Sequence, residues 1–409
     1  MHSPLNVKRL SAASFGHFAI DILNASVAMI LTSVSGQFEL SVSQIGLGAM
    51  IYTFAAALTQ PLFGIVADRW RGRWLGAIGL LWTMVFFALA SFAPTYPILV
   101  ACLTVGALGS GAFHPVGLIN AGASGGRYPT TATSVFFVLG QSGLAIGPII
   151  SGILLQRMGL AALPWMALAM TPAVIMLALY LREPIPDSAA HAVGHAAPRA
   201  GSAPAPVAMA GQRSRAAIVT AFVLLIALRA TTTQGFVTLL PKYFDDLGYS
   251  SAAYGTLIGI FSFAGAIGTF IGGYLGDRFK RRHVIFVSMV LSAPFSYALL
   301  NASGWAYLVT AAMAGALLNI PHSILLIMAQ ALLPKRKGLM GGAVLGFMFA
   351  SGAATAWLAS WFADIYGLEA VLTVLAFIPI GAGLCALVLP STRPARLSTP
   401  VTPDPAAAD

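Results

Sequence analysis

Long apolar segments recur along almost the whole chain, each separated from the next by a short polar stretch. A helix needs about 20 consecutive, predominantly apolar residues to cross the hydrocarbon core of a bilayer. Lipid offers the backbone no hydrogen-bond partners, so such segments must be helical. Twelve segments meet these requirements: 11–34, 44–66, 74–94, 97–121, 131–155, 162–181, 216–241, 252–275, 283–301, 304–330, 338–363 and 369–390. The pattern predicts an all-α, multi-pass membrane protein with twelve transmembrane helices.

The same short charged motif follows the second and the eighth apolar segments. It places Asp68 in the first half and Asp277 in the second, an offset of 209 residues. At that offset, Asp21 in the first segment falls beside Arg229 in the seventh. Repetition over half the chain is typical of secondary transporters, which are built from two related membrane bundles. We therefore predict two pseudo-symmetric six-helix bundles.

The apolar pattern is interrupted once in the middle of the chain and ends before the C-terminus. Residues 182–215 are rich in Ala, Pro, Gly, Ser and His, a composition typical of a flexible tether. The prediction is an N-terminal bundle over 1–181, a cytoplasmic linker over 182–215 and a C-terminal bundle over 216–390. Residues 391–409, with several further prolines, are expected to form a disordered cytoplasmic tail.

The distribution of basic residues predicts the orientation in the membrane. Only 8% of the residues are charged, against about 25% in a typical soluble protein. Of the 22 Lys and Arg residues, 19 fall on the side of the termini. Loops rich in Lys and Arg stay in the cytoplasm, so we expect both termini to be cytoplasmic and the chain to lie in the inner cell membrane. The positive charge is scattered over short turns without interleaved aromatics, which argues against a nucleic-acid partner.

A polar stripe runs along the first apolar segment. Ser14, His17, Asp21 and Asn24 are spaced by 3, 4 and 3 residues, so they share one face of a helix. Asp21 and Arg229 both lie near the middle of their segments, where a lone charge costs about 2.5–3.5 kcal/mol. Each is therefore the expected partner of the other. In one interpretation Arg229 holds an anionic substrate group and Asp21 responds to protonation; in the other they form a permanent ion pair that fixes the packing.

Three histidines occupy apolar segments at similar depth: His17, His114 and His322. Because histidine titrates near neutral pH, such a cluster can relay protons between the central charges and the cytoplasm. Alternatively, each imidazole satisfies a backbone carbonyl freed by a neighbouring proline, since Pro115 follows His114 and Pro321 precedes His322. The sequence leaves both interpretations open.

A metal site is the third possibility for these side chains. His17 and Asp21 have the i, i+4 spacing with which a helix can chelate a metal ion. No cysteine or methionine cluster accompanies them, and Arg229 would repel a cation. We therefore predict no metal and no cofactor. The predicted substrate-binding and coupling residues are Asp21, Arg229, His17, Asn24, His114, Asn319, His322, Thr232, Thr233 and Gln141.

The first copy of the charged motif has the form Gly-x3-Asp-Arg-x2-Gly-Arg, met by Gly64, Asp68, Arg69, Gly72 and Arg73. In this respect the chain resembles the major facilitator superfamily, and the resemblance extends over nearly all twelve segments. It implies a central site bounded by segments 1, 4, 7 and 10, and a charged loop that gates the cytoplasmic side. The residues to which it assigns this gating role are Gly64, Asp68, Arg69, Gly72, Arg73, Asp277 and Arg278. The same arginines also serve as the positive-inside signal.

A narrower resemblance rests on three further patterns. They are His17-x3-Asp21-x2-Asn24 in the first segment, residues 109–115 in the fourth, and Ser-Gly-Gly-Arg at 124–127. With these the chain is similar to the fosmidomycin resistance protein family.

The fifth segment contains Gly143-x3-Gly147-Pro148, which resembles the antiporter motif of drug exporters and favours export. Simple helix packing explains the same small residues. The fourth segment departs from many proton-coupled exporters, because His114 stands where they carry an arginine.

Together these patterns predict proton-coupled efflux of a small anionic organic compound or antibiotic, by alternating access of the two bundles. The alternative is a proton symporter that takes up an organic anion, and a metal-ion carrier is less favoured. No nucleophile with a base, and no paired acids, lie at one depth, so we do not expect an enzyme. The predicted partners are a small-molecule substrate, protons and the lipid bilayer, and we expect a monomer.

Overall fold

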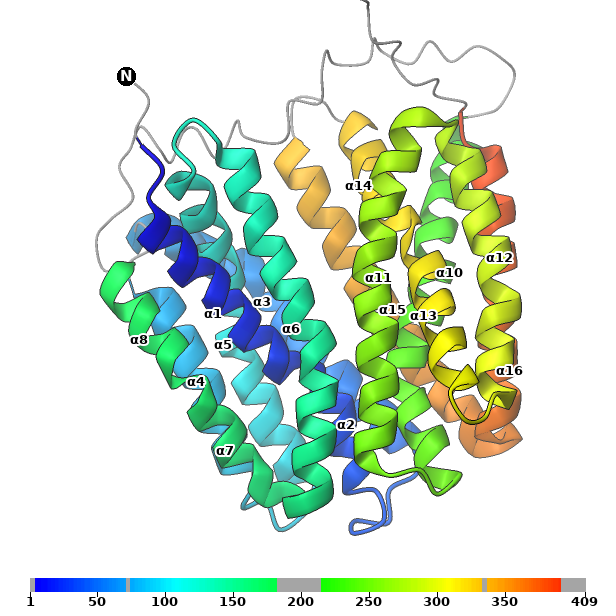
Figure 1. Cartoon of the computed structure of the whole chain (residues 1–409), viewed down its shortest axis with the longest axis horizontal. Coiled ribbons are helices and arrows are strands. Elements are labelled where there is room, and N and C mark those ends of the chain that lie inside the picture. The colour runs from blue at the N-terminus through cyan, green and yellow to red at the C-terminus, as the bar shows by residue number, and fades with distance from the viewer. Residues whose placement is uncertain (1–3, 71–73, 182–214, 333–336, 391–409) are drawn as a thin grey trace, which may run out of the picture.

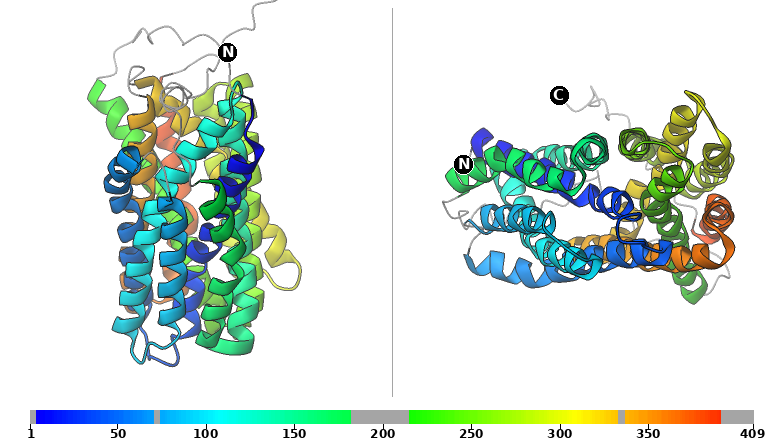
Figure 2. Two further views of the ribbon diagram at one scale, coloured as in Figure 1. Left: turned by 90° about the vertical axis from the view of Figure 1, so that its left-hand side faces the viewer. Right: turned by 90° about the horizontal axis from the view of Figure 1, so that it is seen from below.

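The computed structural model describes residues 4–70, 74–181, 215–332 and 337–390, and within them every regular element is a helix. The helices form two bundles that lie side by side (Figure 1, Figure 2). The predicted linker, apart from Arg215, and the predicted tail 391–409 lie outside the described residues. The prediction of an all-α membrane protein with two pseudo-symmetric bundles is confirmed.

Each predicted segment corresponds to one helix or to one interrupted helix. The N-terminal bundle consists of α1 (Val7–Ala25), α2 (Val27–Ser33), α3 (Val42–Trp70), α4 (Leu75–Ala90), α5 (Tyr96–Ser124), α6 (Pro129–Met158), η1 (Gly159–Ala161), α7 (Ala162–Ala169) and α8 (Thr171–Tyr180). The C-terminal bundle consists of α10 (Arg215–Asp246), α11 (Ser251–Arg278), α12 (Arg281–Asn301), α13 (Ala306–Asn319), α14 (Pro321–Leu332), α15 (Lys337–Tyr366) and α16 (Leu368–Val388).

Three predicted segments are interrupted within their span. The first segment breaks between α1 and α2 at Ser26, whose hydroxyl donates to the Ile22 carbonyl at 2.7 Å. A serine that bonds back by one turn bends a helix. The tenth breaks between α13 and α14, where Pro321 has no N–H to continue the ladder. The sixth breaks between α7 and α8, with Pro172 in the first turn of the second piece.

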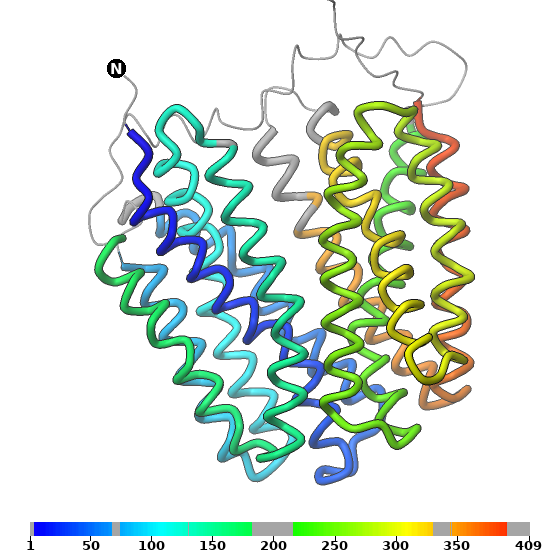
Figure 3. Tube along the Cα trace, in the orientation of Figure 1, coloured from blue at the N-terminus to red at the C-terminus, as the bar shows by residue number. Residues whose placement is uncertain are grey.

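The two ends of the molecule differ in how the bundles meet. We call the end where α1 begins and α16 ends the terminal end, and the opposite one the distal end (Figure 1, Figure 3). Across the interface α6 packs along α11, and α3 packs along α15. Near the distal end these pairs approach through small residues: Gly46 lies against Ser360, and Gly152 lies against Gly255. A β-carbon at any of these glycines would collide with the facing helix.

Glycines nearer the terminal end of the same helices face partners in their own bundle. Gly268 and Gly272 of α11 lie against backbone carbonyls of α13 and of Ile320, and Gly64 of α3 faces Pro115 of α5. The close small-residue contacts between bundles are thus concentrated at the distal end of the part of the chain that the structure describes. This conformation is closed at its distal end.

Candidate functional site

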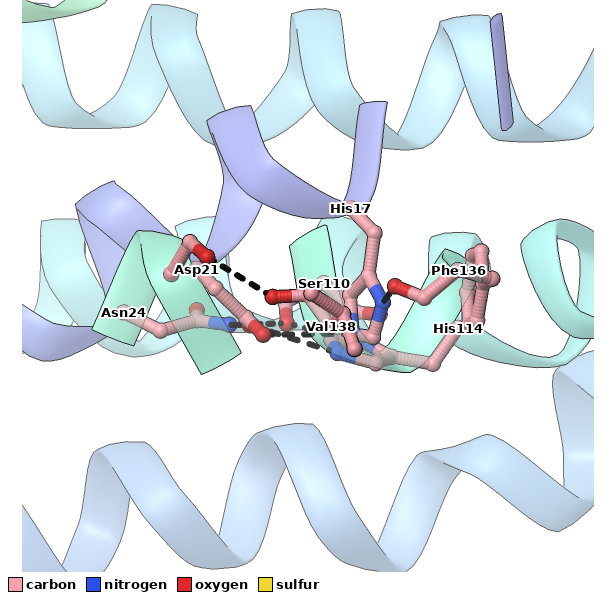
Figure 4. Close-up of polar contacts among 8 residues, drawn as sticks. His17, Asp21, Asn24, Ser110, His114, Phe136 and Val138 are labelled. Carbon is pink, nitrogen blue, oxygen red and sulfur yellow. Dashed lines mark hydrogen bonds and ion pairs between the residues drawn. The ribbon is translucent and has the colours of Figure 1, made fainter. Parts of the chain in front are cut away.

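Asp21 lies on α1, buried inside the N-terminal bundle, and three side chains converge on its carboxylate (Figure 4). Its Oδ2 atom lies 3.1 Å from His17 Nε2, and its Oδ1 atom lies 3.4 Å from His114 Nε2. Asn24 Nδ2 donates to Oδ1 at 2.9 Å. The structure therefore brings together four predicted site residues, His17, Asp21 and Asn24 from α1 and His114 from α5.

Backbone carbonyls fix the orientation of both imidazole rings. His17 Nδ1 lies 2.8 Å from the Phe136 carbonyl oxygen, and His114 Nδ1 lies 2.8 Å from that of Ser110. A carbonyl oxygen only accepts, so each Nδ1 carries a hydrogen and each Nε2 is directed at Asp21. The carboxylate and an unprotonated Nε2 would both be acceptors. For both contacts to be hydrogen bonds, the cluster must hold two protons beyond those on the Nδ1 atoms.

Two further residues complete this cluster. Asn24 Nδ2 also donates to Ser110 Oγ at 3.0 Å, and its Oδ1 accepts from the Tyr52 hydroxyl at 2.6 Å. Sequence reasoning missed both. Ser110 has a usable signal, because it lies one helical turn before His114 on the same face. Tyr52 has none, since it stands in an apolar segment far from Asn24 in the sequence.

An aromatic wall and a glycine hold the His17 ring. The ring stacks on Phe136, with ring centroids 4.0 Å apart and an interplanar angle of 21°. A β-carbon at Gly140 of α6 would overlap the ring itself, so only glycine fits there. The neighbouring predicted residue Gln141 is exposed on α6. Gly140 therefore positions the His17 ring, and the binding role expected of Gln141 stays a prediction.

Arg229 lies on α10, buried inside the C-terminal bundle, with its guanidinium directed at the interruption between α13 and α14. Its Nε donates to the Leu318 carbonyl at 2.8 Å, and its Nη2 donates to Asn319 Oδ1 at 2.6 Å. His322 Nδ1 lies 3.5 Å from Nη2. The structure therefore gathers the predicted residues Arg229, Asn319 and His322, and the broken helix supplies the acceptors.

The expected direct pair between Asp21 and Arg229 does not form in this structure. Instead, Asp21 pairs with two histidines of its own bundle. The Arg229 guanidinium has no carboxylate within ion-pair distance among the described residues. Its acceptors take hydrogen bonds from Nε and Nη2 but leave the positive charge without a counter-charge, which is costly in a buried site.

The two predicted threonines of α10 have other roles in this conformation. Thr232 donates to the Leu375 carbonyl at 2.9 Å and so ties α10 to α16. Thr233 donates to the Arg229 carbonyl at 3.1 Å, within its own helix. The structure does not bring Thr232 to the guanidinium, because its side chain points towards α16.

The predicted gating residues are only partly described. Gly64 is half-buried on α3, and Asp68 and Arg69 lie on the last turn of that helix, where only the backbone is described. Gly72 and Arg73 lie outside the described residues. Asp277 and Arg278 end α11 and are exposed, and the Arg278 guanidinium stands 4.2 Å from the centroid of the Tyr274 ring. The gating role of this motif stays a prediction.

The cluster around Asp21 also bears on the metal alternative. The donor atoms of His17, Asp21 and His114 all lie within 4.8 Å of one another, a spacing that accommodates a cation other than a proton. However, the backbone carbonyls already account for both ring orientations without a metal ion. The prediction of a metal-free site stays a prediction.

The fold and these two polar groups, one in each bundle, define the class of protein. The model of the Major Facilitator Superfamily matches residues 13–250 and again residues 222–407. The chain therefore belongs to the major facilitator superfamily, and it is a membrane transporter rather than an enzyme.

Individual relatives cover nearly the whole chain. The Fosmidomycin resistance protein of Escherichia coli (strain K12) is 30% identical over 392 residues, which are 94% of this chain and 93% of that protein. An uncharacterised MFS-type transporter of Bacillus subtilis (strain 168), YfnC, is 28% identical over 391 residues, 93% and 92% of the two chains. Among solved structures, a bacterial homologue of the human lysosomal transporter Spinster, inward-facing and occupied, has a TM-score of 0.75 at 14% identity. That match covers 95% of this chain and 97% of the other, and it shows the fold alone.

Proposed function

We propose that this transporter exports a small anionic organic compound by alternating access of its two bundles, and that proton entry drives the export. The observation that carries the proposal is the charge of Arg229. It is a buried guanidinium with neutral acceptors and with no carboxylate partner among the described residues. A carboxylate or phosphonate on the substrate supplies the missing counter-charge, and the planar guanidinium suits either group.

The cluster around Asp21 supports proton coupling. Its two imidazoles and one carboxylate lie in contact, and their hydrogen bonds are complete only when protons are shared among them. His114 is the least buried of the three, with 23% of its side chain exposed, and gives protons an entry point. In the proposed cycle, protonation of this group in one bundle and anion release in the other occur in the same conformation.

The orientation follows from the positive-inside rule. We propose that the chain lies in the inner cell membrane as a monomer, with both termini and the terminal end in the cytoplasm. The structure, closed at its distal end, is then the inward-facing state. The bundles 1–181 and 216–390 are the units proposed to rock against each other, with 182–215 as their connection and 391–409 as a cytoplasmic tail.

The relative from Escherichia coli suggests the substrate. Its name links it to resistance against fosmidomycin, and this chain is similar to it over nearly its full length. We therefore propose fosmidomycin-like antibiotics as candidate substrates of an antiporter. Proton symport of an organic anion into the cell uses the same residues and is the second candidate.

The test is transport by the purified protein in liposomes under an imposed pH gradient. Fosmidomycin flux that saturates and runs against the direction of proton flow supports proton-driven export. Flux in the same direction as the protons would support the symporter instead. If no organic anion moves while Zn²⁺ or Co²⁺ does, the proposal is wrong and the metal-ion carrier is right.

A further inference from the structure

The first turn of α3 uses hydrogen-bond acceptors from both bundles. A helix leaves its first N–H groups without intrahelical partners. Here Ser41 Oγ accepts from the Gln44 amide at 3.3 Å and Gln44 Oε1 accepts from the Ser41 amide at 2.9 Å, a capping box. The two remaining amides, of Val42 and Ser43, donate to Oδ1 and Oδ2 of Asp364 at 2.8 and 3.0 Å. Asp364 belongs to α15, in the other bundle.

The first turn of α11 is capped in the same two ways. Ser250 Oγ, from the same chain segment, accepts from the Ala253 amide at 3.3 Å. Gln156 Oε1, from the last turn of α6 in the other bundle, accepts from the Ala252 amide at 3.3 Å. Thus at the distal end each bundle starts one helix whose cap is completed by a side chain from the end of a helix in the other bundle.

These two crossed caps are related by the internal repeat of the chain. The offset of 209 residues carries Ser43 onto Ala252, and it carries Gly46 onto Gly255. The two crossed acceptors fall within one position of each other under the same offset. Behind each cap, Gly46 and Gly255 are the positions where the facing helices come closest. Each crossed cap, together with the close glycine contact next to it, therefore forms one structural unit, and the unit occurs once in each half of the chain.

The two units differ in charge. Asp364 is a carboxylate that accepts two hydrogen bonds at a helix N-terminus, where the helix dipole favours a negative charge. Gln156 is neutral and accepts one longer bond. Separation of the bundles at the distal end breaks all three bonds. Water then replaces each cap, and the loss is greater at α3 than at α11.

We propose that Asp364 and Gln156 are the gating residues of the distal end, and that Asp364 contributes most to holding this end closed. The inference rests on the alternating access of the proposed function. It does not depend on the substrate, on protons or on the direction of transport.

The experiment measures how often the distal end is open. Spin labels are attached at Gln37→Cys and Ala370→Cys, exposed positions at the distal end of different bundles, after Cys102 and Cys385 are replaced by serine. Pulsed electron paramagnetic resonance then gives the distance distribution without any substrate. Asp364→Ala is expected to increase the population of long distances about fivefold, the change expected when a helix cap is removed. Asp364→Asn, which retains one acceptor oxygen, should give a smaller increase.

Matched variants make the result decisive. Gln156→Ala should increase the open population less than Asp364→Ala does. Glu369→Gln removes another exposed acid of the distal end, outside the crossed caps, and should leave the distribution unchanged. Gly46→Leu, which forces α3 away from Ser360, shows that the labels report opening. A distribution unchanged in both Asp364 variants, beside a response to Gly46→Leu, would overturn the inference, even if transport itself behaves as proposed.

Discussion

Asp21 and Arg229 are both buried, but among the described residues only Asp21 lies beside groups that can balance its charge. Two imidazoles face the Asp21 carboxylate and can take up protons beside it. Arg229 is bonded to a backbone carbonyl and an amide oxygen, which are neutral. The removal of each charge should therefore affect a different ligand of the transporter, protons in one case and the anion in the other.

Replacement of Asp21 by asparagine should abolish transport driven by a pH gradient. The amide is nearly the same size and still accepts and donates hydrogen bonds, but it cannot exchange a proton with His17 or His114. Binding of the anion and exchange of labelled for unlabelled substrate should persist. The measurement compares gradient-driven flux with exchange in the same liposomes, and full uphill transport by this variant would remove Asp21 from the coupling role.

Arg229→Ala should weaken the binding of anionic substrates about 10- to 100-fold, the usual worth of a hydrogen-bonded charge. A neutral analogue of the same size should lose much less. Arg229→Lys retains the charge but not the planar guanidinium, so intermediate binding is expected. Equilibrium binding to the purified protein checks all three, and an equal loss for the anionic and the neutral ligand would indicate a structural role only.

At this scale the sequence predicted which polar residues share one face of α1 better than which residues of other helices they contact. The spacing of His17, Asp21 and Asn24 placed them on one face, and the structure joins them. The partner of Arg229 was not predictable, because repeat position and depth do not give the rotation of α10 about its axis. The acceptors of Arg229 belong to Leu318 and Asn319, at the end of α13 just before the break, and their proximity to α10 follows only from the packing of the helices.

At the scale of the helices, the site residues are positioned by glycines and by helix interruptions. Gly140 lets α6 approach α1 until the His17 ring lies on Phe136. The interruption between α13 and α14 exposes the acceptors that Arg229 needs. Neither feature carries a charge, and both act on the site through backbone geometry.

Gly140→Ala should displace the His17 ring and impair coupling, although no titratable group is removed. The added methyl group overlaps the ring, and overpacking of this kind costs about 1–3 kcal/mol of stability. A lower midpoint of thermal unfolding and a reduced gradient-driven flux are expected. Gly346→Ala on α15 is the matched control, since its β-carbon would meet open space and alanine favours a helix. If the two variants melt and transport alike, Gly140 does not position the ring.

The apolar pattern predicted every helical segment, because the requirement to span lipid leaves a strong and simple signal. It did not predict the interruptions at Ser26 and after Asn319. A serine that bonds back to Ile22 and a proline without an N–H are compatible with a continuous helix as well as with a break. Whether the helix is continuous or interrupted depends on its packing against neighbouring helices, and the local sequence does not give the positions of those helices.

At the scale of the molecule, the two bundles make their close small-residue contacts at the distal end, and most of the basic residues that the structure describes lie towards the terminal end. A transporter that alternates must expose its site to each side in turn, so the orientation of this closed end in the membrane determines which state the structure represents.

The orientation can be checked by labelling in intact cells that lack the two native cysteines. A cysteine introduced at Gly36, in an exposed distal loop, should react with a membrane-impermeant maleimide added outside. A cysteine introduced at Tyr128, exposed at the terminal end, should react only after the membrane is permeabilised. The opposite pattern would reverse the proposed topology and make this state outward-facing.

In the proposed cycle, the guanidinium of Arg229 also makes the C-terminal bundle sensitive to voltage whenever no anion is bound to it. One elementary charge that crosses the full membrane potential corresponds to about 2.3 kcal/mol per 100 mV. A bound monovalent anion cancels that charge, so the loaded C-terminal bundle turns over with little electrical work. Without the anion, the bundle carries the positive charge of Arg229 when it moves. A membrane potential that is negative inside therefore favours the conformation in which this charge faces the cytoplasm. The membrane potential would then favour the return of the anion-free transporter to the inward-facing state, in which the next substrate molecule binds.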